Sequence, residues 1–278
     1  MILDKINLKE HFPSLPNDVI LESYCPSNFS EWSTYDKRKC VLILPGGGYH
    51  FLSERESEPV ALKLNGANIA CFVLKYSIFP NITYPSPLID VYAALAYIRR
   101  NADKYHILKD KISVLGFSAG GHLAAATSAY HTNQEFADFL GITLDEMKIN
   151  GCLLSYPVIS MDFGHEDSIK AVTKDNPELK KFLSIDKNVT KDFPKTFIWH
   201  TTFDTIVKVQ NSLALALELE KNKIFFELHI YPMHDHGQAL ATEAVYNKVN
   251  TPSPNFLNEI KYNTQWMENC IHFIKEYI

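Results

Sequence analysis

The amino-acid sequence predicts an α/β fold with a mostly parallel central sheet and helices on both faces. Short apolar, β-branched runs recur from about residue 40 onward, and helical patterns separate several of them. Strands joined by helical crossovers run parallel, and a parallel sheet buries both of its faces. The chain has 278 residues, of which 46% are apolar and 21% charged. That length and composition suit one large domain with a buried core.

Six apolar runs are the expected strands of the sheet. Most of them lack strict alternation of apolar and polar residues, which is typical of strands covered on both faces. Residues 1–39 are expected to add a strand or two at the sheet edge. The six runs span residues 40–44, 69–74, 111–117, 150–156, 196–200 and 225–231.

Three segments have the periodicity of amphipathic helices. Residues 87–101 place apolar side chains at three- and four-residue steps, and they open on a proline and close near two arginines, as helices prefer. Residues 209–221 repeat this pattern, with Leu213 and Leu217 expected on the inner face. The third helix is expected over residues 255–278, with an apolar stripe of Phe256, Ile260, Trp266, Cys270, Phe273 and Ile274.

Residues 159–192 interrupt the alternation of strands and helices. They are rich in Asp, Lys and Asn, and a short helical piece is expected near residues 177–183. We expect a cap or lid inserted between two strands, with a solvated excursion of no role as the alternative. Because no repeat or flexible linker divides the sequence, residues 1–278 are expected to form one domain.

Charge and composition argue against several functional classes. The 27 basic and 32 acidic residues give a net charge of −5, and no block of Lys or Arg offers a nucleic-acid surface. No apolar run approaches the ~18 residues that a membrane span requires. The first ten residues lack the pattern of a secretory signal, so a cytoplasmic location is expected. The five cysteines are scattered and the histidines lack ligand spacing, so we expect no metal or other cofactor.

The most informative motif is the G-x-S-x-G of residues 116–120, Gly-Phe-Ser-Ala-Gly. It follows an expected strand and precedes an alanine-rich helical run, as a nucleophile elbow does. The glycines leave room for a strained serine backbone, and the start of the following helix favours negative charge at the hydroxyl. Ser118 is therefore the candidate nucleophile, and a glycine-rich turn with an incidental serine is the alternative.

A glycine triplet stands directly after the expected strand 40–44, in Pro45-Gly46-Gly47-Gly48-Tyr49. Glycines leave backbone N–H groups unobstructed, and such groups can stabilise a carbonyl oxygen that becomes an oxyanion. Together with Ser118, this loop is a candidate for part of an oxyanion hole, and the N–H of Ala119, the residue after the nucleophile, is expected to supply a further donor. No G-K-[ST] follows, which excludes a phosphate-binding P-loop.

A nucleophilic serine needs a base, and the base needs an orienting carboxylate. In chains with this elbow, the acid and then the base follow the ends of later strands. Asp204 follows the expected strand 196–200 and is the candidate acid, with Asp162 in reserve. Of the two histidines after the strand 225–231, His236 is favoured over His234, because Gly237 relieves crowding beside a loop-borne imidazole.

Two other polar features receive a structural interpretation. His122 falls one helical turn after Ser118 and is expected to pack or hydrogen-bond beneath the elbow. The charged run Ser53–Glu58 follows the glycine triplet and is expected to be a solvated helix start.

The motifs together resemble the small bacterial esterase family of the α/β-hydrolase superfamily, over about residues 40–245. The resemblance rests on Leu44–Tyr49, on GFSAGGHL at residues 116–123, on the D-x-x-V of residues 204–207 and on His236-Gly237. It implies the α/β-hydrolase fold, with Ser118, Asp204 and His236 as a catalytic triad and Gly47, Gly48 and Ala119 as the oxyanion hole.

The family includes acetyl-xylan and sugar-ester hydrolases and carboxylesterases. The resemblance therefore implies a cofactor-free serine carboxylesterase, with acetylated sugars or xylo-oligosaccharides as candidate substrates. Short acyl chains are expected because no long apolar lid is evident in the sequence. The same triad cleaves amides and formyl groups, so an arylformamidase or an aminopeptidase-like enzyme stays open. A non-catalytic binding protein of this fold is the third alternative, and a homo-oligomer is possible.

Overall fold

A computed structural model of the protein describes residues 1–29, 31, 36–82, 84–232, 234–245 and 261–278. Its described residues form an eight-stranded sheet in the order β1-β2-β4-β3-β5-β6-β7-β8. The first two strands run antiparallel to their neighbours, and the other six are parallel. The strands are β1 (Lys5–Asn7), β2 (Ile20–Tyr24), β3 (Arg38–Leu44), β4 (Ala70–Lys75), β5 (Ile107–Phe117), β6 (Gly151–Ser155), β7 (Lys195–Thr201) and β8 (Phe226–Tyr231).

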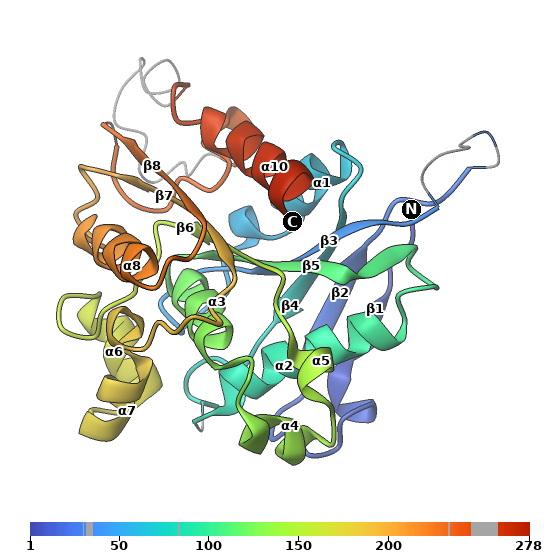
Figure 1. Cartoon of the computed structure of the whole chain (residues 1–278), viewed down its shortest axis with the longest axis horizontal. Coiled ribbons are helices and arrows are strands. Elements are labelled where there is room, and N and C mark those ends of the chain that lie inside the picture. The colour runs from blue at the N-terminus through green and yellow to red at the C-terminus, as the bar shows by residue number, and fades with distance from the viewer. Residues whose placement is uncertain (30, 32–35, 83, 233, 246–260) are drawn as a thin grey trace.

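Helices cover both faces of this sheet (Figure 1). Along β3, Val41 and Ile43 join the core under α1 and α10, whereas Leu42 and Leu44 join the core under α2 and α3. This two-sided burial explains the continuous apolar strands and confirms the predicted α/β class. The helices are α1 (Glu58–Asn65), α2 (Ser86–Arg100), α3 (Ala119–Tyr130), α4 (Gln134–Leu140), α5 (Leu144–Met147), α6 (Glu166–Thr173), α7 (Pro177–Leu183), α8 (Gln210–Lys221) and α10 (Gln265–Tyr277), with 3₁₀ turns η1 (Leu8–Glu10), η2 (Glu54–Glu56), η3 (Ile185–Lys187) and η4 (Glu243–Val245).

The strand order reverses between β3 and β5. From β3 the chain passes outward to β4 and then returns across β3 to pair β5 with it. In open parallel sheets, ligands bind beyond the carboxyl ends of the strands at such a switch point. Leu44 at the end of β3 pairs with Gly116 of β5, so the glycine triplet and Ser118 leave adjacent strands at the same edge.

The predicted strands are confirmed, and two helix predictions need correction. In α8 the expected inner residues Leu213 and Leu217 are exposed, and Leu215 and Leu219 are buried instead. The sequence offers leucines on two helical faces, and the buried face also carries Asn211, whose amide oxygen accepts hydrogen bonds from two backbone N–H groups. The backbone N–H groups of the neighbouring loop need this acceptor, and this need determines which face of α8 is buried.

The carboxyl-terminal helix is shorter in the structure than the sequence predicts. It begins at Gln265, after a turn over residues 261–264. Four predicted stripe residues, Trp266, Cys270, Phe273 and Ile274, are buried against the sheet as expected, whereas Phe256 and Ile260 lie outside the described residues. In the portion of the chain that the structure covers, no helix has the length and apolar character needed to cross a bilayer.

Candidate active site

Ser118 occupies a sharp turn between β5 and α3, with φ 53° and ψ −117°. A Cβ on Gly116 would lie 2.1 Å from the carbonyl oxygen of Gly120, and a Cβ on Gly120 would lie 2.1 Å from that of Leu44. Both glycines are thus required for the strand, turn and helix to approach one another. The Ser118 N–H donates to Ser155 O at 3.0 Å, which holds the strained turn against β6.

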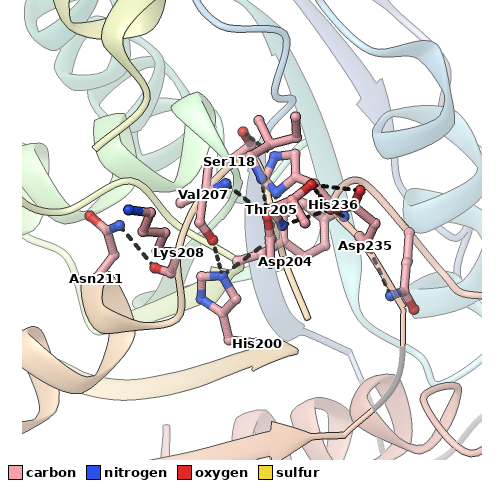
Figure 2. Close-up of polar contacts among 12 residues, drawn as sticks. Ser118, His200, Asp204, Thr205, Val207, Lys208, Asn211, Asp235 and His236 are labelled. Carbon is pink, nitrogen blue, oxygen red and sulfur yellow. Dashed lines mark hydrogen bonds and ion pairs between the residues drawn. The ribbon is translucent and has the colours of Figure 1, made fainter. Parts of the chain in front are cut away.

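The structure brings Ser118, His236 and Asp204 together at the carboxyl ends of the strands (Figure 2). The Ser118 hydroxyl lies 2.7 Å from His236 Nε2, and His236 Nδ1 lies 2.6 Å from Asp204 Oδ2. Ser118 is partly exposed. With an ionised Asp204, the imidazole Nδ1–H donates to the carboxylate and leaves Nε2 to accept the serine proton.

Asp162, the reserve acid, is not near this group. It is exposed and forms an ion pair with Lys187 inside the segment 159–192. Asp235, the neighbour of His236 in sequence, has a different task. Its carboxylate accepts hydrogen bonds from the N–H and the hydroxyl of Thr205, at 2.8 and 2.9 Å, and so joins the loop after β7 to the loop after β8.

The side chain of Asp204 is almost completely buried. Burial acts to raise its pKa, but hydrogen bonds from His200 and His236 and from the backbone outweigh burial and hold the pKa of Asp204 below its usual range. One carboxylate oxygen accepts the N–H groups of Ile206 and Val207 at 3.1 and 2.7 Å. The two histidines and these backbone donors together keep Asp204 ionised at neutral pH.

His200 is a second histidine on Asp204 that the sequence analysis did not single out. Its side chain is fully buried on β7, and its Nε2 lies 2.8 Å from Val207 O and 3.3 Å from Asp204 Oδ2. Because both of these atoms accept, Nε2 carries the proton, and Nδ1 accepts from the Ser212 hydroxyl at 2.7 Å. The sequence did contain a signal for this contact, because His200 lies in an expected strand only four residues before Asp204, the candidate acid.

The glycine triplet lies beside the serine. A Cβ on Gly46 would stand 3.0 Å from Ser118 Cβ, and Gly47 and Gly48 have positive φ values of 130° and 63°. Within the described ranges, no hydrogen bond occupies the N–H groups of Gly47, Gly48 or Ala119. Two of these unpaired N–H groups thus belong to the loop beside Ser118, and the third belongs to the residue that follows Ser118.

Residues 21–219 match the model of the BD-FAE family. The chain belongs to the BD-FAE family. It is 34% identical over 222 residues to endo-1,4-beta-xylanase B of Butyrivibrio fibrisolvens, covering 76% of this chain and 34% of that protein. It is 29% identical over 218 residues to an acetylxylan esterase of Xylanibacter ruminicola, covering 75% of this chain and 43% of that protein. The chain thus spans less than half the length of these curated relatives.

Among solved structures, this BD-FAE chain is similar to an acetyl ester-xyloside bifunctional hydrolase from Caldicellulosiruptor lactoaceticus. The TM-score is 0.79 at 33% identity, and the match covers 98% of this chain and 95% of that one. The likeness and the strand order agree with the predicted α/β-hydrolase fold, which is confirmed.

His122 links three parts of the BD-FAE chain around the elbow. Its Nε2 donates to Leu183 O at 2.9 Å, and its Nδ1 accepts from the Tyr49 hydroxyl at 2.8 Å. Tyr49 ends the glycine loop, and Leu183 ends α7 in the segment 159–192. His122 therefore hydrogen-bonds beneath the elbow, as the sequence predicts, and also ties the glycine loop to that segment.

Burial lowers the pKa of His122 to about 4. An unfolded chain takes up a proton at this residue near pH 6.5, whereas the folded protein does not until about pH 4, so acid favours unfolding over this interval. We expect the free energy of unfolding to decrease between pH 7 and pH 4, with His122 contributing on the order of 3 kcal/mol at most. Urea unfolding at several pH values should show a shallower pH dependence in His122→Asn and an unchanged one in the control His272→Asn, which alters an exposed histidine of α10. An unchanged slope in His122→Asn would contradict this assignment.

The run Ser53–Glu58 leads into the start of α1 as predicted, but it is only partly solvated, because Glu54 and Glu58 are exposed and the residues between them are not. Glu56 is only 3% exposed, and Ser53 and Ser57 are also buried. The reason is that Glu56 turns inward to meet hydrogen-bond donors that lie far from it in the sequence.

Proposed function

We propose that this protein is a serine carboxylesterase that hydrolyses short-chain, acetyl-type esters, with acetylated sugars or xylo-oligosaccharides among its substrates. The observation that carries the proposal is the hydrogen-bonded line from Ser118 Oγ through His236 to a buried, ionised Asp204. The names of two relatives, an acetylxylan esterase and an acetyl ester-xyloside hydrolase, favour acetylated xylan fragments as the substrate class.

In the proposed reaction, His236 Nε2 takes the proton of Ser118 while Oγ attacks the ester carbonyl carbon. The C–O bond to the leaving alcohol then breaks, and the imidazolium gives its proton to that oxygen. Water attacks the acyl-enzyme with the same histidine as base, which releases the carboxylic acid and restores the serine. Asp204 holds the imidazole in the tautomer that accepts from serine and stabilises its charged form.

The N–H groups of Gly47, Gly48 and Ala119 are proposed to bind the oxyanion of the tetrahedral intermediate. Each such donor contributes on the order of 3 kcal/mol to the transition state. Their lack of other partners supports this role, because a donor that is already paired must give up its bond to serve the oxyanion.

The segment 159–192 is proposed to be a cap over the acyl side of the site. A Cβ on Gly48 would stand 3.4 Å from Ser168 Oγ, so the start of α6 lies against the glycine loop. The neighbouring His165 Nδ1 lies 2.9 Å from the same hydroxyl. The polar groups of Ser168 and His165 beside the glycine loop are consistent with a short acyl chain there.

A panel of substrates tests the proposed function. We expect kcat/KM to be highest for acetyl esters and to decrease at least about tenfold by hexanoyl, because hexanoyl adds four methylenes and even one methylene that an acyl site does not accommodate costs ~1–3 kcal/mol. Acetylated xylo-oligosaccharides should exceed N-formylkynurenine and aminoacyl anilides. Preference for the formyl or anilide substrate would replace the esterase proposal with an arylformamidase or an aminopeptidase-like enzyme. A protein that a fluorophosphonate probe leaves unlabelled would be a binding protein.

A further inference from the structure

Glu56 is a buried carboxylate beside the site with no part in the reaction described above. It is the last residue of η2, two positions before α1 begins, and is 3% exposed. A buried carboxylate is costly unless donors satisfy it, so its partners show what it holds in place. Oε2 accepts the Gly46 N–H at 2.8 Å, and Oε1 accepts the Tyr156 hydroxyl at 2.7 Å.

The first partner is the residue of the glycine loop that borders the nucleophile. A Cβ on Gly46 would meet Glu56 Oε2 at 2.8 Å and Ser118 Cβ at 3.0 Å, so Gly46 is enclosed between the carboxylate and the serine. Gly47 and Gly48, the proposed oxyanion donors, follow directly. The bond from Glu56 therefore sets where these N–H groups stand relative to Ser118.

The second partner leads to the proposed base. Tyr156 follows β6, and its hydroxyl accepts the Ala239 N–H at 2.8 Å while it donates to Glu56. Its ring also packs against the His236 ring, with centroids 4.9 Å apart and the planes at 70°. The loop after β8 is thus attached to Tyr156 at Ala239 and supported by it at His236.

Arg55, adjacent to Glu56, reaches the same loop independently. Its Nη1 donates to the carbonyl oxygen of Gly237 at 2.9 Å, next to His236. Two consecutive side chains of η2 therefore hold two loops that leave different strands. Glu56 binds the glycine loop after β3, and Arg55 binds the His236 loop after β8. In the proposed reaction, both loops act on one carbonyl group.

We propose that Glu56 is a positioning residue that fixes the oxyanion loop, through Gly46, relative to the His236 loop, through Tyr156. This inference rests on the proposed esterase function. Displacement of catalytic groups by about 1 Å can cost on the order of 100-fold in rate, so the loss of either bond lowers kcat without removing a reacting atom.

Steady-state kinetics of Glu56→Gln, Glu56→Ala, Tyr156→Phe and the double variant Glu56→Gln/Tyr156→Phe on p-nitrophenyl acetate test the proposal. Active sites are counted by fluorophosphonate labelling carried to completion, so that kcat refers only to folded, reactive enzyme. Glu54→Gln is the matched control, because it removes the same charge from an exposed position of the same turn.

We expect Glu56→Ala to lower kcat per labelled site about 10- to 100-fold, with KM changed by less than about threefold. Glu56→Gln is expected to lose less, because its amide oxygen still accepts the Gly46 N–H. The kcat of the double variant should be no lower than that of the slower single variant, because both substitutions disrupt the same contact between Glu56 and Tyr156. Glu54→Gln should match the wild type.

A kcat per labelled site within about twofold of wild type in Tyr156→Phe and in the Glu56 variants, with losses only in labelled sites or thermal stability, would overturn the proposal. So would additive losses in the double variant. Failure of the esterase function itself would look different, as no ester turnover by the wild type or as full turnover by Ser118→Ala.

Discussion

Ser118→Ala will reduce ester turnover to the level of an enzyme without a nucleophile, a loss in kcat on the order of 10⁵ to 10⁶. Alanine has no oxygen to form the acyl-enzyme, and His236 Nε2 then has no hydroxyl to accept from. The proposed oxyanion donors and the substrate contacts would remain and leave a small residual rate above water. Initial rates on p-nitrophenyl acetate and the absence of fluorophosphonate labelling measure this loss.

The fold should survive this substitution. The backbone of residue 118 keeps its bonds, because Ser118 N donates to Ser155 O and Ser118 O accepts from His122 N, and neither uses the hydroxyl. We therefore expect a Tm close to that of wild type. Ser128→Ala, in the helix α3 that follows Ser118, is the serine control and should keep full activity. Turnover above a few per cent of wild type in Ser118→Ala would place the nucleophile elsewhere.

Asp204→Asn is expected to lower kcat about 10⁴-fold. The amide oxygen can still accept from Ile206 N and Val207 N, so the loop keeps its shape. The amide NH₂ group then faces His236 Nδ1, which must accept instead of donate, and the proton moves to Nε2. In that tautomer His236 cannot take the proton of Ser118.

The pH dependence separates this explanation from simple loss of charge. The pKa of Asp204 lies below its usual range, so the wild-type carboxylate is ionised throughout neutral pH and its contribution to stability is lost only as the pH falls below about 4. We expect raising the pH from 6 to 9 to leave the activity of Asp204→Asn low, because no titration restores the tautomer.

Asp162→Asn provides the matched control. Asp162 is exposed and paired with Lys187, and its substitution should leave kcat within about twofold of wild type, as surface ion pairs contribute little. Activity that depends on Asp162 and not on Asp204 would reassign the acid to the segment 159–192.

The parts of the site that could be read from the sequence are those made by contiguous residues. The elbow around Ser118 is a strand, a turn and a helix in one short run, and its glycines are needed for contacts that arise within that run and the neighbouring strand. Asp204 and His236 could be ranked because each follows an apolar strand. The choice of His236 depended on its neighbour Gly237, which has a φ of 76°.

The residues that sequence reasoning missed have partners far away in the chain. Glu56 looked like one charge in a polar run, and it became buried because Gly46 and Tyr156 offer donors from two other strand ends. His200 looked like one isolated histidine, and α8 offered two leucine faces. In each case the local sequence pattern is compatible with both a buried and an exposed side chain.

The amino-acid sequence by itself determined the order of strands and helices, the buried character of the sheet and the strained turn at Ser118, because these depend on periodicity and on residues close together in the chain. Only the tertiary structure decided which carboxylates became buried and which faces of the helices turned inward. Those outcomes depend on which hydrogen-bond donors the parallel strands bring to a common edge, and burying a polar group is favourable only where such donors meet it.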